Sequence, residues 1–296
     1  MSELSKNLGK SFLVTAEISL PRGPDLGEFM HEIGEFRKLT PKLHGVNAVD
    51  NPGAMLRMSS LAASIMLKQN GLDPIYQLVG RDRNQLALQA DLIGAAAFGI
   101  ENVLALTGDH PTCDSSDHPK AKPVFDLNSV TLIKAIKLMN QGKNFAGGNL
   151  NKPTGFFIGA ALAPNAASVE GEIYKTRKKI DAGVDFFQTQ VVFESTVVGD
   201  FVDKCESLIK EDIRDRVLVG VLPLYSYDIL KFLRKLPGIV VSNKIEKRMK
   251  DADDPAEEGS NIAAEVIDGA REMGAGGVHI MPIGKVDGLV KLMETI

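Results

Sequence analysis

Short apolar segments alternate with amphipathic segments along the whole chain. Eight of the apolar segments are rich in β-branched or aromatic residues, as strands are: 11–20, 44–50, 73–80, 101–108, 155–162, 185–193, 217–224 and 277–283. Several of the segments between them have helical spacing and end in glycine, as helix C-termini commonly do. This regular alternation indicates βα units that build a parallel sheet.

The number of strands favours a closed barrel. Eight strands in 296 residues fit a (β/α)8 TIM barrel better than a doubly wound sheet, which usually has fewer strands and a glycine-rich dinucleotide turn. No GxGxxG motif follows any of the eight segments. We therefore predict an α/β fold in which residues 1–296 form a single (β/α)8 domain, with an insertion around 237–258 before the last βα unit.

Composition narrows the class of protein. Hydrophobic residues make up 44% of the chain and charged residues 24%, values typical of a soluble globular protein. The net charge of −4 argues against a nucleic-acid-binding surface. The two cysteines, Cys113 and Cys205, have no metal-ligand spacing, so we expect no metal site. The N-terminus lacks a signal-peptide pattern and no segment is apolar enough to span a membrane, so a cytoplasmic location is expected.

Polar residues gather at the predicted ends of the strands. Active sites of such barrels lie at the C-terminal ends of the strands, which makes these residues candidates: Glu17, Asp50, Asn51, Gln77, Asp109, Gln190, Glu194, Tyr225, Tyr227 and Lys285. Glu17 and Gln190 each interrupt an apolar strand, and a buried carboxylate or amide must be hydrogen-bonded or functional. The alternative for Glu17 is a strand position that faces solvent.

The fourth predicted strand ends in the sequence LALTGDHP, residues 104–111. Gly108 permits a positive φ and Asp109 can bond to neighbouring backbone, so the step can be only a turn. It can equally bring a carboxylate to a ligand at the barrel rim. Both interpretations are open at the level of this segment alone.

Five segments together resemble the bacterial methylenetetrahydrofolate reductase family, in order and in spacing. They are TAEISLPRG at 15–23, LALTGDHP at 104–111, KKIDAGVDFFQTQVVFE at 178–194, VGVLPL at 219–224 and GVHIMPI at 277–283. The resemblance implies an oxidoreductase of one-carbon metabolism that uses FAD. Hydride would pass from the reduced flavin to 5,10-methylenetetrahydrofolate, giving 5-methyltetrahydrofolate, or in the reverse direction, with NAD(P)H as an electron donor.

The resemblance also implies roles for individual residues. Glu17 matches the general acid that protonates the leaving ring nitrogen, a task that suits a carboxyl whose pKa is raised by desolvation. Asp109 matches the acid beside the flavin ring and the pterin, where it would favour the cationic iminium. Gln190 matches an amide that binds the pterin. Tyr227, with Tyr225 as the alternative, and Lys285 match further substrate contacts.

For the flavin, the resemblance implies a longer set of contacts. They are Gln77, Thr107, Gly108, Asp109, Glu172, Lys175, Lys178 and Lys179. The lysines would neutralise phosphates, although a solvated helix face is the alternative for such a charge run. The loops at 48–55 and 160–168 depart from the family's motifs, which puts individual flavin contacts in question.

Residues 117–136 resemble members from anaerobes, which can work beside a small partner subunit that carries cysteines and a metal, and with further electron-transfer proteins. This chain has too few cysteines for an iron–sulfur cluster of its own, so electrons from other donors would need such a partner. A homo- or hetero-oligomer is expected. Two alternatives compete: a flavin-free, folate-binding subunit of a larger methyl-group complex, and a lyase or aldolase on the same barrel.

Overall fold

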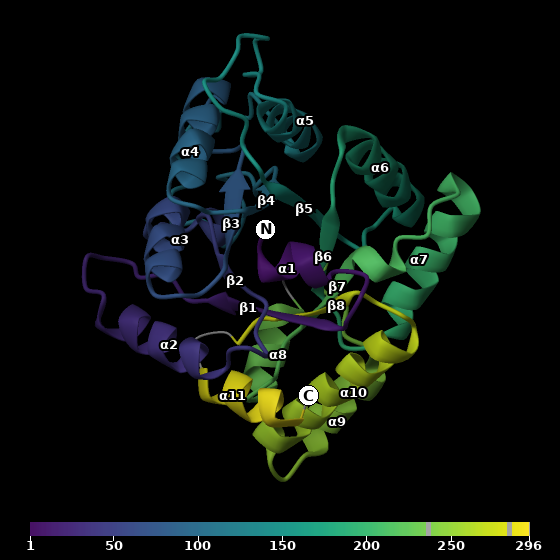
Figure 1. Ribbon diagram of the computed structural model, residues 1–296. Helices are drawn as coiled ribbons and strands as arrows, with labels where there is room; N and C mark the ends of the chain where they lie inside the picture. Colours follow the sequence, from purple (N-terminus) through teal and green to yellow (C-terminus); the bar gives the residue numbers. More distant parts are fainter. Residues whose placement is uncertain (235–237, 283–285, 296) are drawn as a thin grey trace.

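The computed structural model describes residues 1–234, 238–282 and 286–295 and shows a closed barrel of parallel strands in sequence order (Figure 1). The strands are β1 (Leu13–Ile18), β2 (Gly45–Ala48), β3 (Pro74–Val79), β4 (Asn102–Leu106), β5 (Phe157–Leu162), β6 (Phe186–Val191), β7 (Val217–Val221) and β8 (Gly277–Ile280). Each lies within one of the eight predicted segments. The predicted TIM barrel is therefore confirmed.

Helices lie around the barrel and over its two ends (Figure 1). They are α1 (Glu3–Asn7), α2 (Gly27–Lys38), α3 (Ser60–Gln69), α4 (Gln85–Ala97), α5 (Ser129–Asn140), α6 (Val169–Ala182), α7 (Thr196–Ile209), α8 (Tyr227–Leu233), α9 (Asn243–Asp251), α10 (Pro255–Glu272) and α11 (Val286–Thr295), with 3₁₀ turns at Pro52–Ala54 and Arg214–Arg216. None of the helices within the described ranges is long and apolar enough to cross a membrane.

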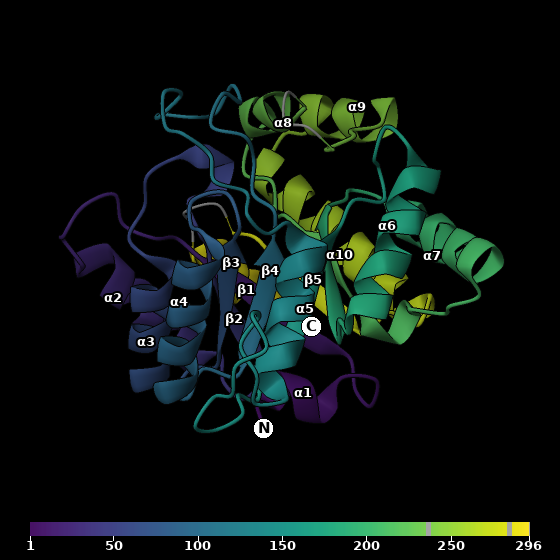
Figure 2. The same ribbon diagram turned by 90° about the horizontal axis from the view of Figure 1, so that it is seen from above.

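Between β7 and α10 the chain forms two additional helices, α8 and α9. Helix α9 lies within the stretch 237–258, and its apolar residues Ile245 and Met249 are one turn apart and buried. They belong to a separate apolar cluster with Leu230 and Leu233 of α8 and Ile262 of α10. Figure 2 shows α8 and α9 on the same side of the barrel as the β4–α5 loop and opposite α1. The additional helices therefore stand above the C-terminal ends of the strands.

The barrel interior is apolar at the N-terminal ends of the strands. Side chains alternate between the two faces of a strand, and one set packs inside the barrel around Leu13, Leu104, Phe186 and Leu218. Leu4 of α1 joins this cluster and closes the N-terminal end. Each such side chain contributes about 1.5–3 kcal/mol by leaving water.

The next layer of the interior is polar and hydrogen-bonded. Asn47 donates to the Gln188 side chain at 2.7 Å and accepts from it at 3.2 Å. The Thr15 hydroxyl lies 3.0 Å from Nδ1 of His279, and burial lowers the pKa of His279 to about 3, so this imidazole is neutral. The interior thus changes from apolar to polar toward the C-terminal mouth, where the candidate site lies.

Candidate functional site

A cavity of about 360 Å³ opens at the C-terminal ends of β2 to β6. Its lining includes Asp50, Asn51, Gln77, Arg81, Thr107, Gly108, Asp109, Ser129, Glu172, Lys175, Lys179 and Gln190. All but one of the residues expected to contact a flavin are therefore brought together, although they come from three separate regions of the chain. The exception is Lys178, which is exposed on α6 and is not part of the lining.

Glu17 and Gln77 form a side-chain pair at the ends of β1 and β3. Glu17 retains some exposed surface, but its carboxyl group is surrounded by protein, and Gln77 is buried. Desolvation raises the pKa of Glu17 to about 7, and the hydrogen bond from Gln77 acts in the opposite direction because it favours the ionised form. In a large fraction of the molecules Glu17 is therefore protonated at neutral pH, as a proton donor requires.

The end of β4 forms a tight step that exposes a carboxylate. Gly108 has φ +87°, and a Cβ built on it would lie 3.0 Å from the Cβ of Arg81 and 3.2 Å from that of Val79. Glycine is thus required for both conformation and space. Asp109 follows as an exposed residue at the rim, while the Thr107 hydroxyl accepts a hydrogen bond from the Ser129 backbone N–H at 3.0 Å.

Helix α6 supplies a buried cation to the cavity wall. Lys179 is 2% exposed; its ammonium group donates to the Ala161 carbonyl at 2.6 Å and to Glu172 Oε1 at 3.1 Å. Burial lowers the pKa of Lys179, and the Glu172 carboxylate opposes that shift. Lys175 lies half-exposed, 3.5 Å from the other oxygen of Glu172. A solvated helix face therefore describes Lys178 but not Lys179.

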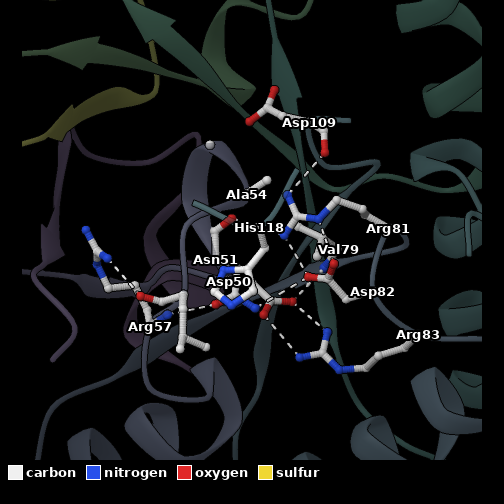
Figure 3. A network of polar contacts seen from close by, with 12 residues as sticks. Asp50, Asn51, Ala54, Arg57, Val79, Arg81, Asp82, Arg83, Asp109 and His118 are labelled. Atoms are coloured by element: carbon white, nitrogen blue, oxygen red, sulfur yellow. Dashed lines mark hydrogen bonds and ion pairs between the residues drawn. The ribbon is translucent and has the colours of Figure 1, made fainter. Parts of the chain in front are cut away.

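The sequence RDRN at 81–84 organises the rim, and sequence reasoning missed it (Figure 3). Arg83 forms a bidentate pair with Asp50 at 2.7 and 3.1 Å, and Asp50 also accepts from the Val79 backbone at 3.0 Å. Arg81 is buried and binds the Asp82 carboxylate through two nitrogens. The alternating charges directly after the third predicted strand were the available signal.

Three predicted substrate contacts have different surroundings. Gln190 is exposed at the end of β6, lines the cavity and has Gly238 packed against its amide. Tyr227 is not part of the lining; its hydroxyl donates to Glu246 of α9 at 3.0 Å. The alternative, Tyr225, donates to the Pro282 carbonyl at 3.2 Å. Lys285 lies outside the described residues.

Comparisons with known proteins identify the family and agree with the fold. The family model described as methylenetetrahydrofolate reductase matches residues 3–296. The 5,10-methylenetetrahydrofolate reductase of Buchnera aphidicola is 25% identical over 295 residues, covering 95% of this chain and 91% of that protein. A probable methylenetetrahydrofolate reductase (NADPH) of Caenorhabditis elegans is 27% identical over 187 residues, covering 63% of this chain, and the match spans only 26% of that longer protein.

Among solved structures, a similar one is an uncharacterized protein from Clostridium thermocellum that binds two copies of 5-methyl-5,6,7,8-tetrahydrofolic acid. Its TM-score is 0.69 at 13% identity, and the match covers 99% of this chain and 98% of that one. At this identity the likeness concerns the fold.

Proposed function

The chain belongs to the methylenetetrahydrofolate reductase family, and from this membership and the site we propose that it interconverts 5,10-methylenetetrahydrofolate and 5-methyltetrahydrofolate with FAD. The observation that carries the proposal is the Glu17–Gln77 pair, a carboxyl group with a pKa of about 7 at the mouth of the barrel. The reaction needs a proton donor at this pH to open the methylene bridge. Membership of this family argues against the lyase or aldolase alternative.

The residues around the cavity fit the flavin. Thr107, Gly108 and Asp109 would contact the ring, because all three line the cavity at the end of β4. Gln77 would contact the ring from β3. On the opposite wall, Glu172, Lys175 and Lys179 would hold the ADP half, where the two ammonium groups neutralise phosphate charge. When bound, FAD supplies hydride transfer; the protein supplies orientation and electrostatics.

Each catalytic side chain has one task. Glu17 delivers its proton to the ring nitrogen that leaves the methylene carbon and recovers it in the reverse direction. The Asp109 carboxylate stabilises the positive charge that develops on the folate as the bridge opens, through a short-range electrostatic interaction at the rim. Gln190 offers both a donor and an acceptor, which is what a pterin edge requires.

We also propose how electrons reach the site. One donor is NAD(P)H. The other is a small cysteine- and metal-containing subunit with further electron-transfer proteins. Such a partner is needed for donors other than NAD(P)H, because two cysteines are too few to hold an iron–sulfur cluster in this chain. Fast NADH oxidation by the isolated chain, together with a native mass that shows only a homo-oligomer, would contradict the partner. Tyr227 and Lys285 remain proposed substrate contacts in a cytoplasmic enzyme.

A second candidate is folate binding without flavin. Lys179 is already satisfied by Glu172 and the Ala161 carbonyl, and Asp50 is engaged by Arg83, which leaves fewer free groups for a dinucleotide. The Clostridium thermocellum protein of similar fold binds 5-methyl-5,6,7,8-tetrahydrofolic acid, and in this second candidate our chain binds the same ligand.

One experiment separates the two candidates. Protein purified without added cofactor, or reconstituted with FAD, should show flavin absorbance that a reductant bleaches and that methylenetetrahydrofolate restores. A colourless protein that cannot be reconstituted but binds methyltetrahydrofolate in calorimetry would reject the reductase and support the flavin-free subunit.

A further inference from the structure

Arg81 connects three loops at the mouth of the barrel (Figure 3). It follows β3, and its guanidinium group donates to the Asn51 carbonyl at 3.1 Å, to the Asp82 carboxylate at 2.7 and 2.6 Å, and to the Asp109 carbonyl at 3.2 Å. These partners belong to the loops after β2, β3 and β4. Only 2% of Arg81 is exposed, and the side chain separates the main cavity from a neighbouring one of about 170 Å³.

We propose that Arg81 is a positioning residue that holds the Asp109–His110 peptide through the Asp109 carbonyl, so that the Asp109 carboxylate faces the bound substrate. The inference rests on the proposed function of Asp109. Arg81 contacts this segment twice. Its guanidinium group donates to the Asp109 carbonyl, and its Cβ lies close to Gly108, where a Cβ on residue 108 would come within 3.0 Å of it. Because Gly108 has a wide choice of conformations, an external constraint is needed to keep Asp109 in one place.

The planar fork of arginine explains why this residue type stands here. Nε and Nη2 bind the two oxygens of Asp82, which leaves Nη1 directed at the Asp109 carbonyl. Asp82 is the main partner of the guanidinium charge and the attraction between Arg81 and the Asp109 carboxylate is weaker, so we assign the effect of Arg81 on Asp109 chiefly to geometry. A lysine keeps the charge but cannot reproduce four directed bonds from one rigid plane.

The test compares Arg81→Met and Arg81→Lys with wild type and with Arg214→Met. Arg214 is a matched control because it forms its own acidic network with Asp203, Glu206 and Asp212 beside the start of β7, away from the mouth. With pre-reduced FAD, Arg81→Met should slow reoxidation by saturating methylenetetrahydrofolate about 100-fold, since a small misplacement of a catalytic group has such effects. Flavin reduction by dithionite should stay within about twofold, and Arg81→Lys should recover only part of the rate.

A double-mutant cycle with Asp109→Asn tests whether Arg81 acts through Asp109. In the Asp109→Asn background, Arg81→Met should change the folate rate by no more than about twofold. Additive losses in folded proteins, or full activity of Arg81→Lys, would overturn the proposal.

A crystal structure of Arg81→Met gives a readout that does not depend on activity. The Asp109–His110 peptide should be displaced while the strands superimpose, and an unmoved peptide would reject the inference. Failure of wild type to bind FAD or to react with folate would instead reject the proposed function, so the two failures are distinguishable.

Discussion

The two halves of the barrel interior differ in chemistry. Near α1 the interior is filled mainly by apolar side chains such as Leu13 and Phe186, and Ser2 at the start of α1 donates a buried hydrogen bond to Asn102 at the start of β4. Toward the opposite end the same strands carry Glu17, Gln77 and Gln188 on the same inward face. A strand repeats its orientation every second residue, so one strand can place a packing residue at the bottom and a reactive residue at the mouth. The apolar half near α1, called the lower half below, stabilises the fold. The half at the C-terminal mouth, called the upper half, buries the Glu17 carboxyl group at a cost in stability.

The largest expected effect is on the rate of the folate half-reaction, from a substitution in the upper half. Glu17→Gln keeps the size and polarity of the side chain but removes the proton, so the folate half-reaction should fall by about 10²- to 10⁴-fold. Reduction of the bound flavin should be nearly unchanged. Stopped-flow measurement of the two half-reactions checks this, and an equal loss in both would refute Glu17 as the acid.

A substitution in the lower half should reduce stability and leave the folate half-reaction nearly unchanged. The Phe186 ring stacks on Phe157 with centroids 5.3 Å apart and covers Gly159, so Phe186→Ala leaves a cavity. The free energy of unfolding should fall by about 3–5 kcal/mol. Urea denaturation measures the loss. The folate half-reaction of the folded variant should remain within a few-fold of wild type; a loss as large as that of Glu17→Gln would contradict the division between the halves.

Two neighbouring lysines on α6 allow a buried position at the rim to be compared with an exposed one. Lys179→Met removes a buried cation from the cavity wall and should weaken FAD binding by about tenfold to 100-fold. Lys178→Met is the matched control on the exposed face and should leave the affinity unchanged. Fluorescence titration of the apoprotein with FAD provides both values. Equal weakening in the two variants would show that overall charge matters rather than the position of Lys179.

The smallest expected effect concerns Gln77. Its hydrogen bond favours the ionised form of Glu17, so Gln77→Leu should raise the pKa of Glu17 above about 7. Protonated Glu17 then persists to higher pH, and the alkaline limit of the folate half-reaction should move upward, with at most about a twofold change at pH 7. A pH profile that keeps its position, or moves to lower pH, would show that Gln77 does not act on this titration.

Much of the site could be predicted because a parallel barrel brings all C-terminal strand ends to one rim. The strand ends at Gln77, Gly108 and Gln190 needed only local hydrophobic patterns to be located, and all three line one cavity. The resemblance added Lys179, whose burial no charge pattern on α6 would have indicated. Tyr227 shows the limit: its hydroxyl is bound by Glu246, 19 residues later, because α8 packs on α9.

The sequence by itself determined the eight strands, their order and the residues at their ends, because short apolar runs rich in β-branched or aromatic residues and helix-ending glycines are local properties of the chain. Only the tertiary structure decided which charges are free and which are engaged. Arg81 reaches carbonyls 28 and 30 residues away, and Arg83 binds Asp50 at a distance of 33 residues. Such bonds depend on how neighbouring loops meet at the rim, and backbone carbonyls carry no residue-specific signal that a sequence could show.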